Sequence, residues 1–360
     1  MYRIGLLYGD DIGMEIMPHV DEMLQQLLSK QIATVEQLPI GMEAYNKFGT
    51  TFPENTLERL KEMHGWVLGP IGHSGYPQVP EAVNPHPIIR KHFDLHSNIR
   101  PSKSRLGTKP LHDKVDLLIV RENNEGFQPD RNAYIGPSEF MPSKDMSISM
   151  RIISRENCEK VARDAFEHAL QRNQKVTAVH KKSVFKHGCG LFTEVCSETA
   201  KEYPTVTYEE INVDACAAAL AQNPQQFDVI VTTNLFGDIL SDLAAGVTGG
   251  LGLASGISAG SEYCMAQAVH GSAPDIAGKG LANPFALVDS AAMLLLWLGE
   301  KYHDQSILRA GETLREALIQ AVSSGRATPD LNGTLTTSQM CSIIKENVSL
   351  QLTGEEHRNE

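Results

Sequence analysis

The feature that most constrains the fold of this chain is the alternation of short apolar runs with longer amphipathic stretches. Runs of β-branched and other apolar residues predict strands at residues 3–8, 66–69, 116–120, 175–180 and 228–232. Residues 157–172 instead place Val161, Ala165 and Ala169 on one helical face, and residues 305–324 show similar spacing. Strands that alternate with helices in this way predict an α/β protein.

Residues 145–154 break this rhythm. Met146, Ile148, Met150 and Ile152 alternate there with mostly polar residues. A repeat of two residues is typical of a half-buried antiparallel strand. We expect this segment to form an arm that could pair with a second subunit.

The length of 360 residues corresponds to roughly two domains of ordinary size. No low-complexity linker or internal repeat separates them, so we expect the two domains to share the chain by crossing over. The formal net charge of −12 argues against a nucleic-acid partner, because phosphate backbones are bound by clustered cations.

The longest apolar run, at residues 291–298, is too short to cross a membrane and predicts a buried helix instead. The N-terminal residues include acids and no long apolar stretch, so we expect no signal peptide and a cytoplasmic location. Six cysteines without a CxxC pair predict reduced thiols in the core.

Asp238 and Asp242 in NLFGDILSD stand four residues apart and therefore project from one face of a helix. Two carboxylates placed so close repel each other unless a cation lies between them. Because ligand sites of α/β sheets gather at strand ends, and this pair follows the run VIVTTN, we expect a hard divalent ion there. Asp214, after a predicted strand at residues 206–213, is a third candidate ligand. A solvated acidic helix face is the alternative.

Residues 270–284 read HGSAPDIAGKGLANP, with many small residues and no apolar periodicity. Such a run lets backbone N–H groups approach a phosphate, so we expect a ligand-binding loop, with a plain surface loop as the alternative. The stretch follows no clear strand and lacks the GxGxxG spacing, which argues against a Rossmann fold.

Arg90, Arg100 and Arg121 are candidate carboxylate binders, because a guanidinium group pairs with a carboxylate through two parallel hydrogen bonds. Beside an acidic metal site they would suit a substrate with two carboxylates. Lys181, at the end of a predicted strand, is a candidate base, although its neighbour Lys182 shows that basic residues here can also serve solvation.

Six ordered segments of the chain resemble the β-decarboxylating dehydrogenases, the family of isocitrate, 3-isopropylmalate, homoisocitrate, tartrate and D-malate dehydrogenases. The resemblance runs nearly end to end and is carried by GDDIGME (9–15), IRKHFDLHSNIRP (89–101), RENNEG (121–126), VHKKSVFK (179–186), NLFGDILSD (234–242) and HGSAPDIAGKGLANP (270–284). It implies a two-domain α/β fold of the isopropylmalate-dehydrogenase type and a homodimer. A discontinuous dinucleotide-binding domain would span residues 1–97 and 245–360, and a middle domain at residues 98–244 would carry the dimerisation arm and the metal and catalytic residues.

The same resemblance implies a role for each candidate residue. The three arginines would hold a malate-like substrate, and Lys181 would act in the partner's site as the base for the C2 hydroxyl. Asp238 and Asp242, with Asp214 contributed by the other subunit, would hold Mg²⁺ or Mn²⁺. The residues implied to contact NAD are His270, Gly271, Ser272, Ala273, Asp275, Ile276, Asn283 and Ser183, with Asp275 at the adenosine ribose. The implied reaction is oxidation at C2 followed by loss of the β-carboxylate as CO₂.

This chain departs from the family pattern at the position of the acid. Relatives carry a tyrosine within two residues of the RExxxG motif, whereas Phe127 and Gln128 stand here. A glutamine amide cannot act as an acid at neutral pH, so Tyr134 is the nearest substitute and Gln128 becomes a candidate substrate contact. The asparagine that usually follows the catalytic lysine by two residues is Ser183.

The substrate is left open among malate and 3-substituted malates. Residues 83–87, which in relatives contact the variable part of the substrate, include Asn84 and His86 and match neither the isopropylmalate nor the isocitrate pattern. Two alternatives to oxidative decarboxylation follow from Gln128. One is a non-catalytic paralogue that regulates a partner subunit, and the other is oxidation without efficient decarboxylation.

Overall fold

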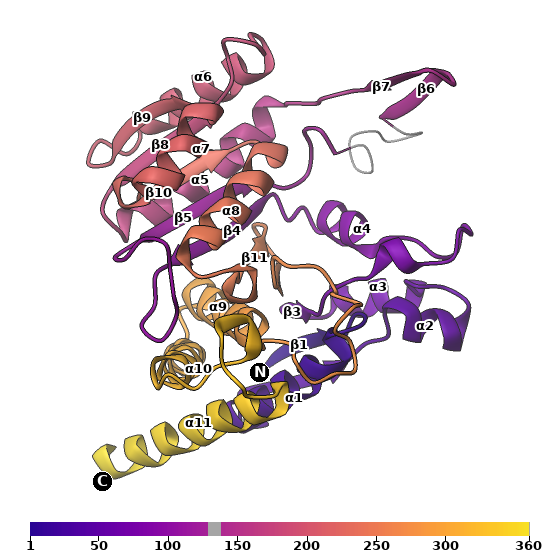
Figure 1. Ribbon diagram of the computed structural model, residues 1–360, viewed down its shortest axis with the longest axis vertical. Helices are drawn as coiled ribbons and strands as arrows, with labels where there is room; N and C mark the ends of the chain where they lie inside the picture. Colours follow the sequence, from indigo (N-terminus) through magenta and orange to yellow (C-terminus); the bar gives the residue numbers. More distant parts are fainter. Residues whose placement is uncertain (129–137, 360) are drawn as a thin grey trace.

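The computed structural model describes residues 1–128 and 138–359, and these form a ten-stranded mixed sheet with helices on both faces (Figure 1). In order across the sheet the strands are β2 (Ala33–Gln37), β1 (Tyr2–Leu7), β3 (Gly65–Leu68), β12 (Cys264–Gln267), β11 (Ile257–Ala259), β4 (Ser97–Lys103), β5 (Asp116–Glu122), β10 (Val229–Thr232), β8 (Lys175–His180) and β9 (Thr207–Asn212). Only the pairs β12–β11, β11–β4 and β4–β5 are antiparallel in this described sheet. The predicted strands and the α/β class are confirmed.

The two ends of the sheet are built from different parts of the chain. The five strands from β2 to β11 come from residues 2–68 and 257–267, whereas the five from β4 to β9 come from residues 97–232. A chain that leaves one half of a sheet and returns to it has the discontinuous organisation that the sequence predicted. The domain boundaries near residues 97 and 245 stay a prediction.

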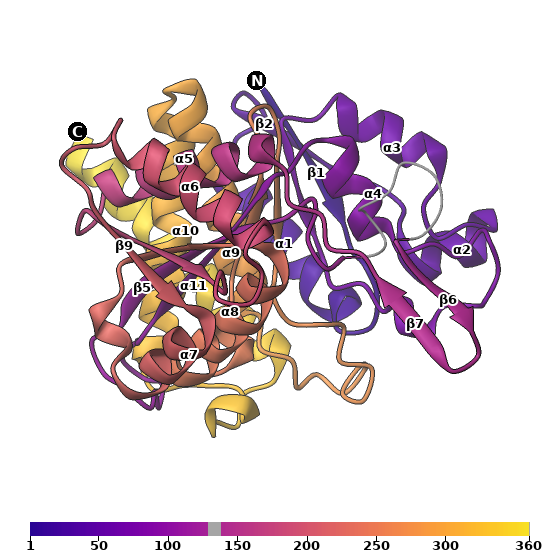
Figure 2. The same cartoon turned by 90° about the horizontal axis from the view of Figure 1, so that it is seen from above.

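Helices cover both faces of this sheet. Their bounds are α1 (Gly13–Leu27), α2 (Gly41–Phe48), α3 (Glu54–Lys61), α4 (Pro85–His92), α5 (Arg155–Leu170), α6 (Gly188–Ala200), α7 (Val213–Gln222), α8 (Asn234–Thr248), α9 (Phe285–Tyr302), α10 (Gln305–Ser323) and α11 (Thr337–Asn359). Short 3₁₀ turns lie at His73–Gly75, Pro224–Gln226, Leu251–Leu253 and Pro329–Leu331. Figure 2 shows α5 and α6 on one side of the sheet and α7 and α8 on the other.

The apolar core is continuous on one face and divided on the other. One cluster joins α1, α9, α10 and α11 to α5 and α6 across both halves of the sheet. On the opposite face, one cluster packs under α3 and α4, and a separate one packs under α7 and α8. Because the second face lacks a shared apolar cluster, α4 and α8 are free to border a polar site between the two halves.

The smaller sequence predictions about the core also hold. The predicted buried helix at residues 291–298 lies within α9, and the six cysteines are free and buried. No helix among the described residues is both long and apolar enough to span a membrane.

The predicted arm is a two-stranded antiparallel ribbon of β6 (Glu139–Ser143) and β7 (Met146–Ser149) that projects from the body (Figure 1). The expectation that its strand is half-buried was wrong, because every residue of both strands is exposed within this chain. Phe140, Met146 and Ile148 are 45%, 54% and 41% exposed. An alternating apolar pattern predicts a buried face, and within the described chain nothing covers that face.

Candidate active site

A cavity of about 380 Å³ opens between α4 and α8, where the two apolar clusters separate. We call it the arginine cavity. Its lining includes many residues that the sequence predicted, namely Arg90, Arg100, Arg121, Asn84, His86, Gln128, Asp238, His270 and Gly271. His73 and Ile71 also line it and were not predicted. The structure therefore brings the predicted substrate-binding set together within one chain.

The three arginines are buried although each carries a charge, with exposed fractions of 6%, 4% and 3% in chain order. Arg121 donates from Nε and Nη2 to Oδ1 of Asn234 at 3.0 and 2.6 Å, and its Nη1 also contacts Asp238. Nη1 of Arg100 donates to Oγ of Ser241 at 2.6 Å and to Oδ1 of Asp238 at 3.2 Å. Nη1 of Arg100 also lies 3.7 Å from Oδ1 of Asp242. Three buried guanidinium groups beside these two carboxylates match a ligand that brings more than one carboxylate of its own.

Local structure explains how these side chains reach the cavity. The side chain of Asn84 caps α4 by accepting a hydrogen bond from the backbone N of His86 at 3.1 Å, and this helix carries Arg90. Gly237 lies against Arg121, whose Cγ would be 2.6 Å from a Cβ at that position. Only a glycine lets the arginine stem cross α8 so closely.

Asp238 and Asp242 lie on one face of α8, as predicted. Burial raises the pKa of Asp238, but the charges of Arg121, Arg100 and Arg90 outweigh this and lower it. The pKa of Asp242 is raised by partial burial and by the charge of Asp238, which exceed the opposing effect of Arg100. No group of three or more metal-ligating side chains occurs within residues 1–128 and 138–359. Two hard oxygen donors fit a divalent cation only if further oxygens come from substrate or another chain.

Lys181 and Asp214 form a separate pair, with Nζ of Lys181 donating to Oδ1 of Asp214 at 2.6 Å. This hydrogen bond lowers the pKa of Asp214. Their side chains are 25% and 67% exposed. In the described part of the chain, neither residue lines the arginine cavity, and the exposed Ser183 does not line it either. The structure thus separates the predicted base and third metal ligand from the substrate-binding set.

The loop at residues 270–284 lies beside two cavities. It follows β12 after Gln267, so the expectation that no strand precedes it was wrong; β12 has only four residues, too few to show a period. Its backbone is fixed on α1, where the Glu15 carboxylate accepts hydrogen bonds from the N of Gly278 and, at 3.1 Å, from that of Gly280. His270 and Gly271 face the arginine cavity, and Ser272 lines a second cavity of about 510 Å³.

The remaining loop residues that were predicted to contact NAD are absent from the described lining of both cavities. Asn283 donates from Nδ2 to Asp330 at 3.0 Å and accepts from the N of Phe285 at 3.0 Å, so its side chain is occupied by the start of α9. Ala273, Asp275 and Ile276 belong to the same loop but, among the described residues, line neither cavity. Asp10, Asp11 and Glu43 line the second cavity and were not predicted.

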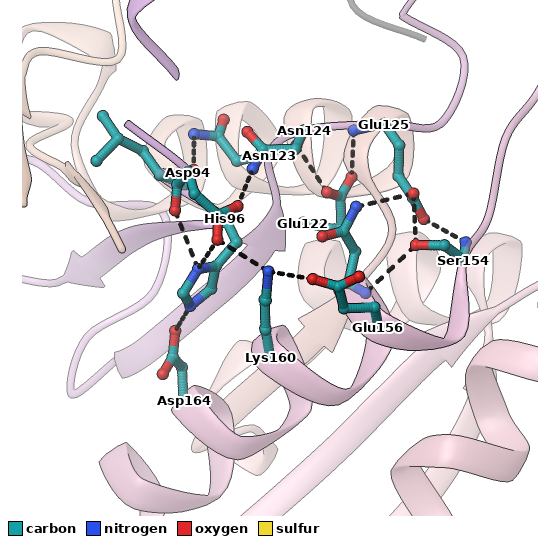
Figure 3. Close-up of polar contacts among 12 residues, drawn as sticks. Asp94, His96, Glu122, Asn123, Asn124, Glu125, Ser154, Glu156, Lys160 and Asp164 are labelled. Carbon is teal, nitrogen blue, oxygen red and sulfur yellow. Dashed lines mark hydrogen bonds and ion pairs between the residues drawn. The ribbon is translucent and has the colours of Figure 1, made fainter. Parts of the chain in front are cut away.

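Figure 3 shows the polar network that holds the loop after β5, which leads to Gln128. The Glu122 carboxylate accepts hydrogen bonds from the N atoms of Asn124 and Glu125 at 2.6 and 3.1 Å. The Glu125 carboxylate accepts hydrogen bonds from the N and Oγ of Ser154 at 2.6 and 2.8 Å. The loop is therefore rigidly tied to the start of α5. The predicted substitute acid, Tyr134, lies outside the described residues.

Arg151 is a further residue that sequence reasoning missed. Its guanidinium carbon lies 4.9, 5.6 and 5.7 Å from the ring centroids of Phe185, Phe236 and Phe127. These rings belong to the Lys181 loop, the start of α8 and the segment before Gln128, so one cation packs against three segments that carry predicted site residues. An arginine that packs against aromatic rings has no acidic partner there, so a pattern of opposite charges in the sequence cannot reveal it.

Comparison with known proteins defines the class. The family model for isocitrate/isopropylmalate dehydrogenase matches residues 3–347. The chain is 39% identical over 350 residues to an isocitrate/homoisocitrate dehydrogenase of Thermus thermophilus, covering 96% of this chain and 98% of that protein. It is 37% identical over 346 residues to a 3-isopropylmalate dehydrogenase of Archaeoglobus fulgidus, covering 96% and 98%.

A solved structure agrees with these sequence matches. The crystal structure of isocitrate dehydrogenase from Methylococcus capsulatus superimposes with a TM-score of 0.86 at 36% identity, covering 97% of this chain and 99% of that one. The protein is an oxidoreductase with the fold of decarboxylating hydroxy-acid dehydrogenases. The chain belongs to the isocitrate/isopropylmalate dehydrogenase family, and the fold predicted from the sequence is confirmed.

Proposed function

We propose that the protein oxidises and decarboxylates a malate-type 2-hydroxy acid with NAD and Mg²⁺ or Mn²⁺. The observation that carries this proposal is the arginine cavity, in which three buried guanidinium groups surround Asp238. Such a site binds two carboxylates of one small molecule and fixes its orientation. The adjoining loop at residues 270–284 would then present NAD to that molecule.

Each group of residues has a separate role in the proposed reaction. Arg90, Arg100 and Arg121 bind and orient the carboxylates, and Lys181 accepts the proton of the C2 hydroxyl as the hydride leaves. Asp238 and Asp242 would hold the divalent cation together with Asp214 of a second copy. That cation would supply Lewis-acid stabilisation of developing negative charge, and NAD would accept the hydride. Asp275 supports a preference for NAD, because a carboxylate accepts hydrogen bonds from a ribose diol and repels a 2′-phosphate.

The lining of the arginine cavity also favours a polar substituent on the substrate. Three amides and three imidazoles line it, from Asn84, Gln128, Gln267, His73, His86 and His270. An alkyl group at C3 offers these groups no hydrogen bonds, whereas a hydroxyl or carboxylate does. We therefore favour tartrate or isocitrate-like acids over 3-isopropylmalate; malate, which has no substituent at C3, fits without these contacts.

Oxidation without efficient decarboxylation is the second candidate function. It is favoured by the position of Gln128 in the lining of the arginine cavity, where relatives carry a tyrosine. An amide can orient a substrate but cannot protonate the enolate that forms when CO₂ leaves. Protonation would then depend on water or on Tyr134.

A homodimer with shared active sites completes the proposal. The exposed apolar ribbon of β6 and β7 supports an intersubunit contact, and the exposed Lys181–Asp214 pair supports a contribution to the partner's site. We also propose a cytoplasmic location, supported by six free cysteines, which are typical of reducing compartments.

The proposal is tested by measuring reduction of NAD and of NADP with malate, tartrate, isocitrate, homoisocitrate and 3-isopropylmalate, each with Mg²⁺ or Mn²⁺ and with excess chelator. We expect metal-dependent turnover of at least one acid with a polar substituent, faster with NAD than with NADP. The absence of turnover on all five acids would favour the non-catalytic alternative. Full activity in chelator would contradict the metal assignment.

A further inference from the structure

The turn between α4 and β4 joins two of the substrate-binding arginines. We call residues 93–96 the α4–β4 corner. Arg90 lies in the last turn of α4 and Arg100 lies within β4. The N of Leu95 donates to the carbonyl oxygen of Arg90 at 2.9 Å, so the corner is bonded directly to the backbone of that arginine. The corner therefore links the backbone positions of the two arginines.

The corner is also bonded to the segment that follows the third arginine. The N of Asn123 donates to the carbonyl oxygen of His96 at 3.0 Å, and its Nδ2 donates to that of Leu95 at 2.8 Å. Nδ2 of Asn124 donates to Oδ1 of Asp94 at 3.0 Å (Figure 3). These residues follow Arg121 by two and three positions, so one network connects the backbones that carry all three arginines.

His96 occupies the centre of this network and is 5% exposed. Its Nε2 lies 3.2 Å from Oδ2 of Asp164 on α5, and its Nδ1 lies 3.1 Å from the carbonyl oxygen of Asp94. Both partners are acceptors, so a neutral imidazole, with one N–H, satisfies only one of them. The geometry therefore fits the doubly protonated imidazolium.

We propose that His96 is a positioning residue whose buried imidazolium fixes the α4–β4 corner against α5 and the loop after β5, and thereby sets the spacing of Arg90, Arg100 and Arg121. This inference rests on the proposed function for the role of the arginines. It adds a residue that touches neither substrate nor cofactor in that proposal.

The charged surroundings of His96 favour its protonated form. The corner contributes Asp94, α5 contributes Asp164 and Lys160, and the loop after β5 contributes the neutral Asn123 and Asn124. His168, also on α5, interacts with Asp164. Nζ of Lys160 donates to Oδ2 of Asp94 at 2.8 Å and to Glu156 at 2.7 Å, so Asp94 is shared between two cations. The strain of a positive φ of 46° at Asp94 persists because these contacts hold it.

Deprotonation of His96 should therefore loosen the corner at high pH. Burial alone lowers the pKa of His96, but the hydrogen bonds and charges of Asp164 and Asp94 outweigh it and raise the pKa from 6.5 to about 9. A group whose pKa is raised on folding contributes stability in full below its ordinary pKa and loses it as pH rises through the folded value. The window in which the arginines lose their spacing thus lies around pH 9, well above the ordinary titration of histidine.

The test uses malate as probe, without NAD or metal, and measures its binding by calorimetry between pH 7 and pH 10. The wild type should bind malate with constant affinity up to about pH 8 and more weakly above that. His96→Gln should bind malate on the order of ten- to a hundredfold more weakly at neutral pH and lose the step near pH 9. His64→Gln is the matched control, because His64 lies in the turn before β3 and its pKa is lowered by burial.

A nuclear magnetic resonance titration of the histidine rings in the wild type supplies a second readout that a merely structural role would not move. The ring signal absent from His96→Gln should titrate near 9. If that variant fails to fold, Asp164→Asn identifies the same signal by lowering its pKa. The proposal would be overturned if the ring of His96 titrates near 6.5. It would also be overturned if His96→Gln binds malate with the same affinity and pH dependence as the wild type. A wild type that binds no malate at any pH would overturn the arginine cavity as a malate site, and with it the positioning role measured by malate binding.

Discussion

The arginine cavity and the Lys181–Asp214 pair are two parts of one predicted catalytic set, and the chain builds them in different ways. In the cavity, three arginines are at most 6% exposed, and two of them, Arg100 and Arg121, are held by bonds to Asn234, Ser241 and Asp238. The Lys181–Asp214 pair lies on the surface, with side chains 25% and 67% exposed, and within the described chain it lines no part of that cavity. The predicted substrate-binding residues thus come together in one chain, whereas the predicted base lies outside their cavity.

This difference supports a site completed by a second copy. A twofold-symmetric dimer presents each surface feature of one chain to the other, so one contact serves both sites. The exposed ribbon of β6 and β7 offers an apolar surface for such a contact. The following predictions test the two halves separately.

The largest effect should come from the base. Lys181→Met removes the group that accepts the hydroxyl proton, so we expect kcat to fall by about 10²–10⁴-fold while malate affinity stays near the wild-type value. Lys182→Met is the matched control, because Lys182 pairs with Glu210 instead of Asp214. Steady-state kinetics combined with calorimetry separate the two effects. Equal losses in both variants would assign the lysines to folding or solvation.

A smaller effect should come from the acidic face of α8. Asp242→Asn removes one anionic oxygen from a set that has only two carboxylates in one chain, so the metal concentration for half-maximal activity should rise by about 10–100-fold. Glu346→Gln, on the exposed face of α11, is the control for loss of a negative charge. An unchanged metal requirement in Asp242→Asn would favour a solvated acidic helix face.

The smallest effect should come from Gln128, which lines the arginine cavity. If the acid of the last step is absent, NADH should form faster than CO₂ is released in the wild type. Gln128→Tyr should then speed CO₂ release by about tenfold, below the usual ceiling for general acid catalysis of about 10²–10⁴-fold. Matched NADH and CO₂ rates in the wild type, with Gln128→Tyr slower in both, would instead make Gln128 a specificity residue.

Three of the predicted site residues lie at or just after the end of a strand, whereas Arg100 lies in the middle of β4. Arg121 lies near the end of β5, Lys181 follows β8, and Asp238 follows β10 within the first turns of α8. Because strand ends in α/β sheets converge, local patterns and the family resemblance together were enough to find these residues. The α/β alternation was visible for the same reason, since apolar periodicity is a local signal.

The parts that the sequence did not reveal depend on contacts between distant segments. The side chain of Asn283 is occupied by Asp330, and Nε2 of His96 lies 3.2 Å from Oδ2 of Asp164 on α5. No period or spacing links such residues. Likewise, β12 is too short to show a pattern, and the apolar residues of β7 predicted a burial that a single chain does not supply.

The measurement that tests the shared site most directly is complementation between two inactive variants. Arg121→Ala damages the substrate-binding half, and Lys181→Ala damages the base. If each site combines arginines of one chain with the lysine of the other, a mixed dimer contains one intact site and one doubly damaged site. Co-expression with random pairing should then restore about a quarter of wild-type activity, although each variant alone is inactive. If the arginines and the lysine of one site belong to the same chain, no mixed dimer contains an intact site, and the absence of restored activity in purified mixed dimers would contradict the account.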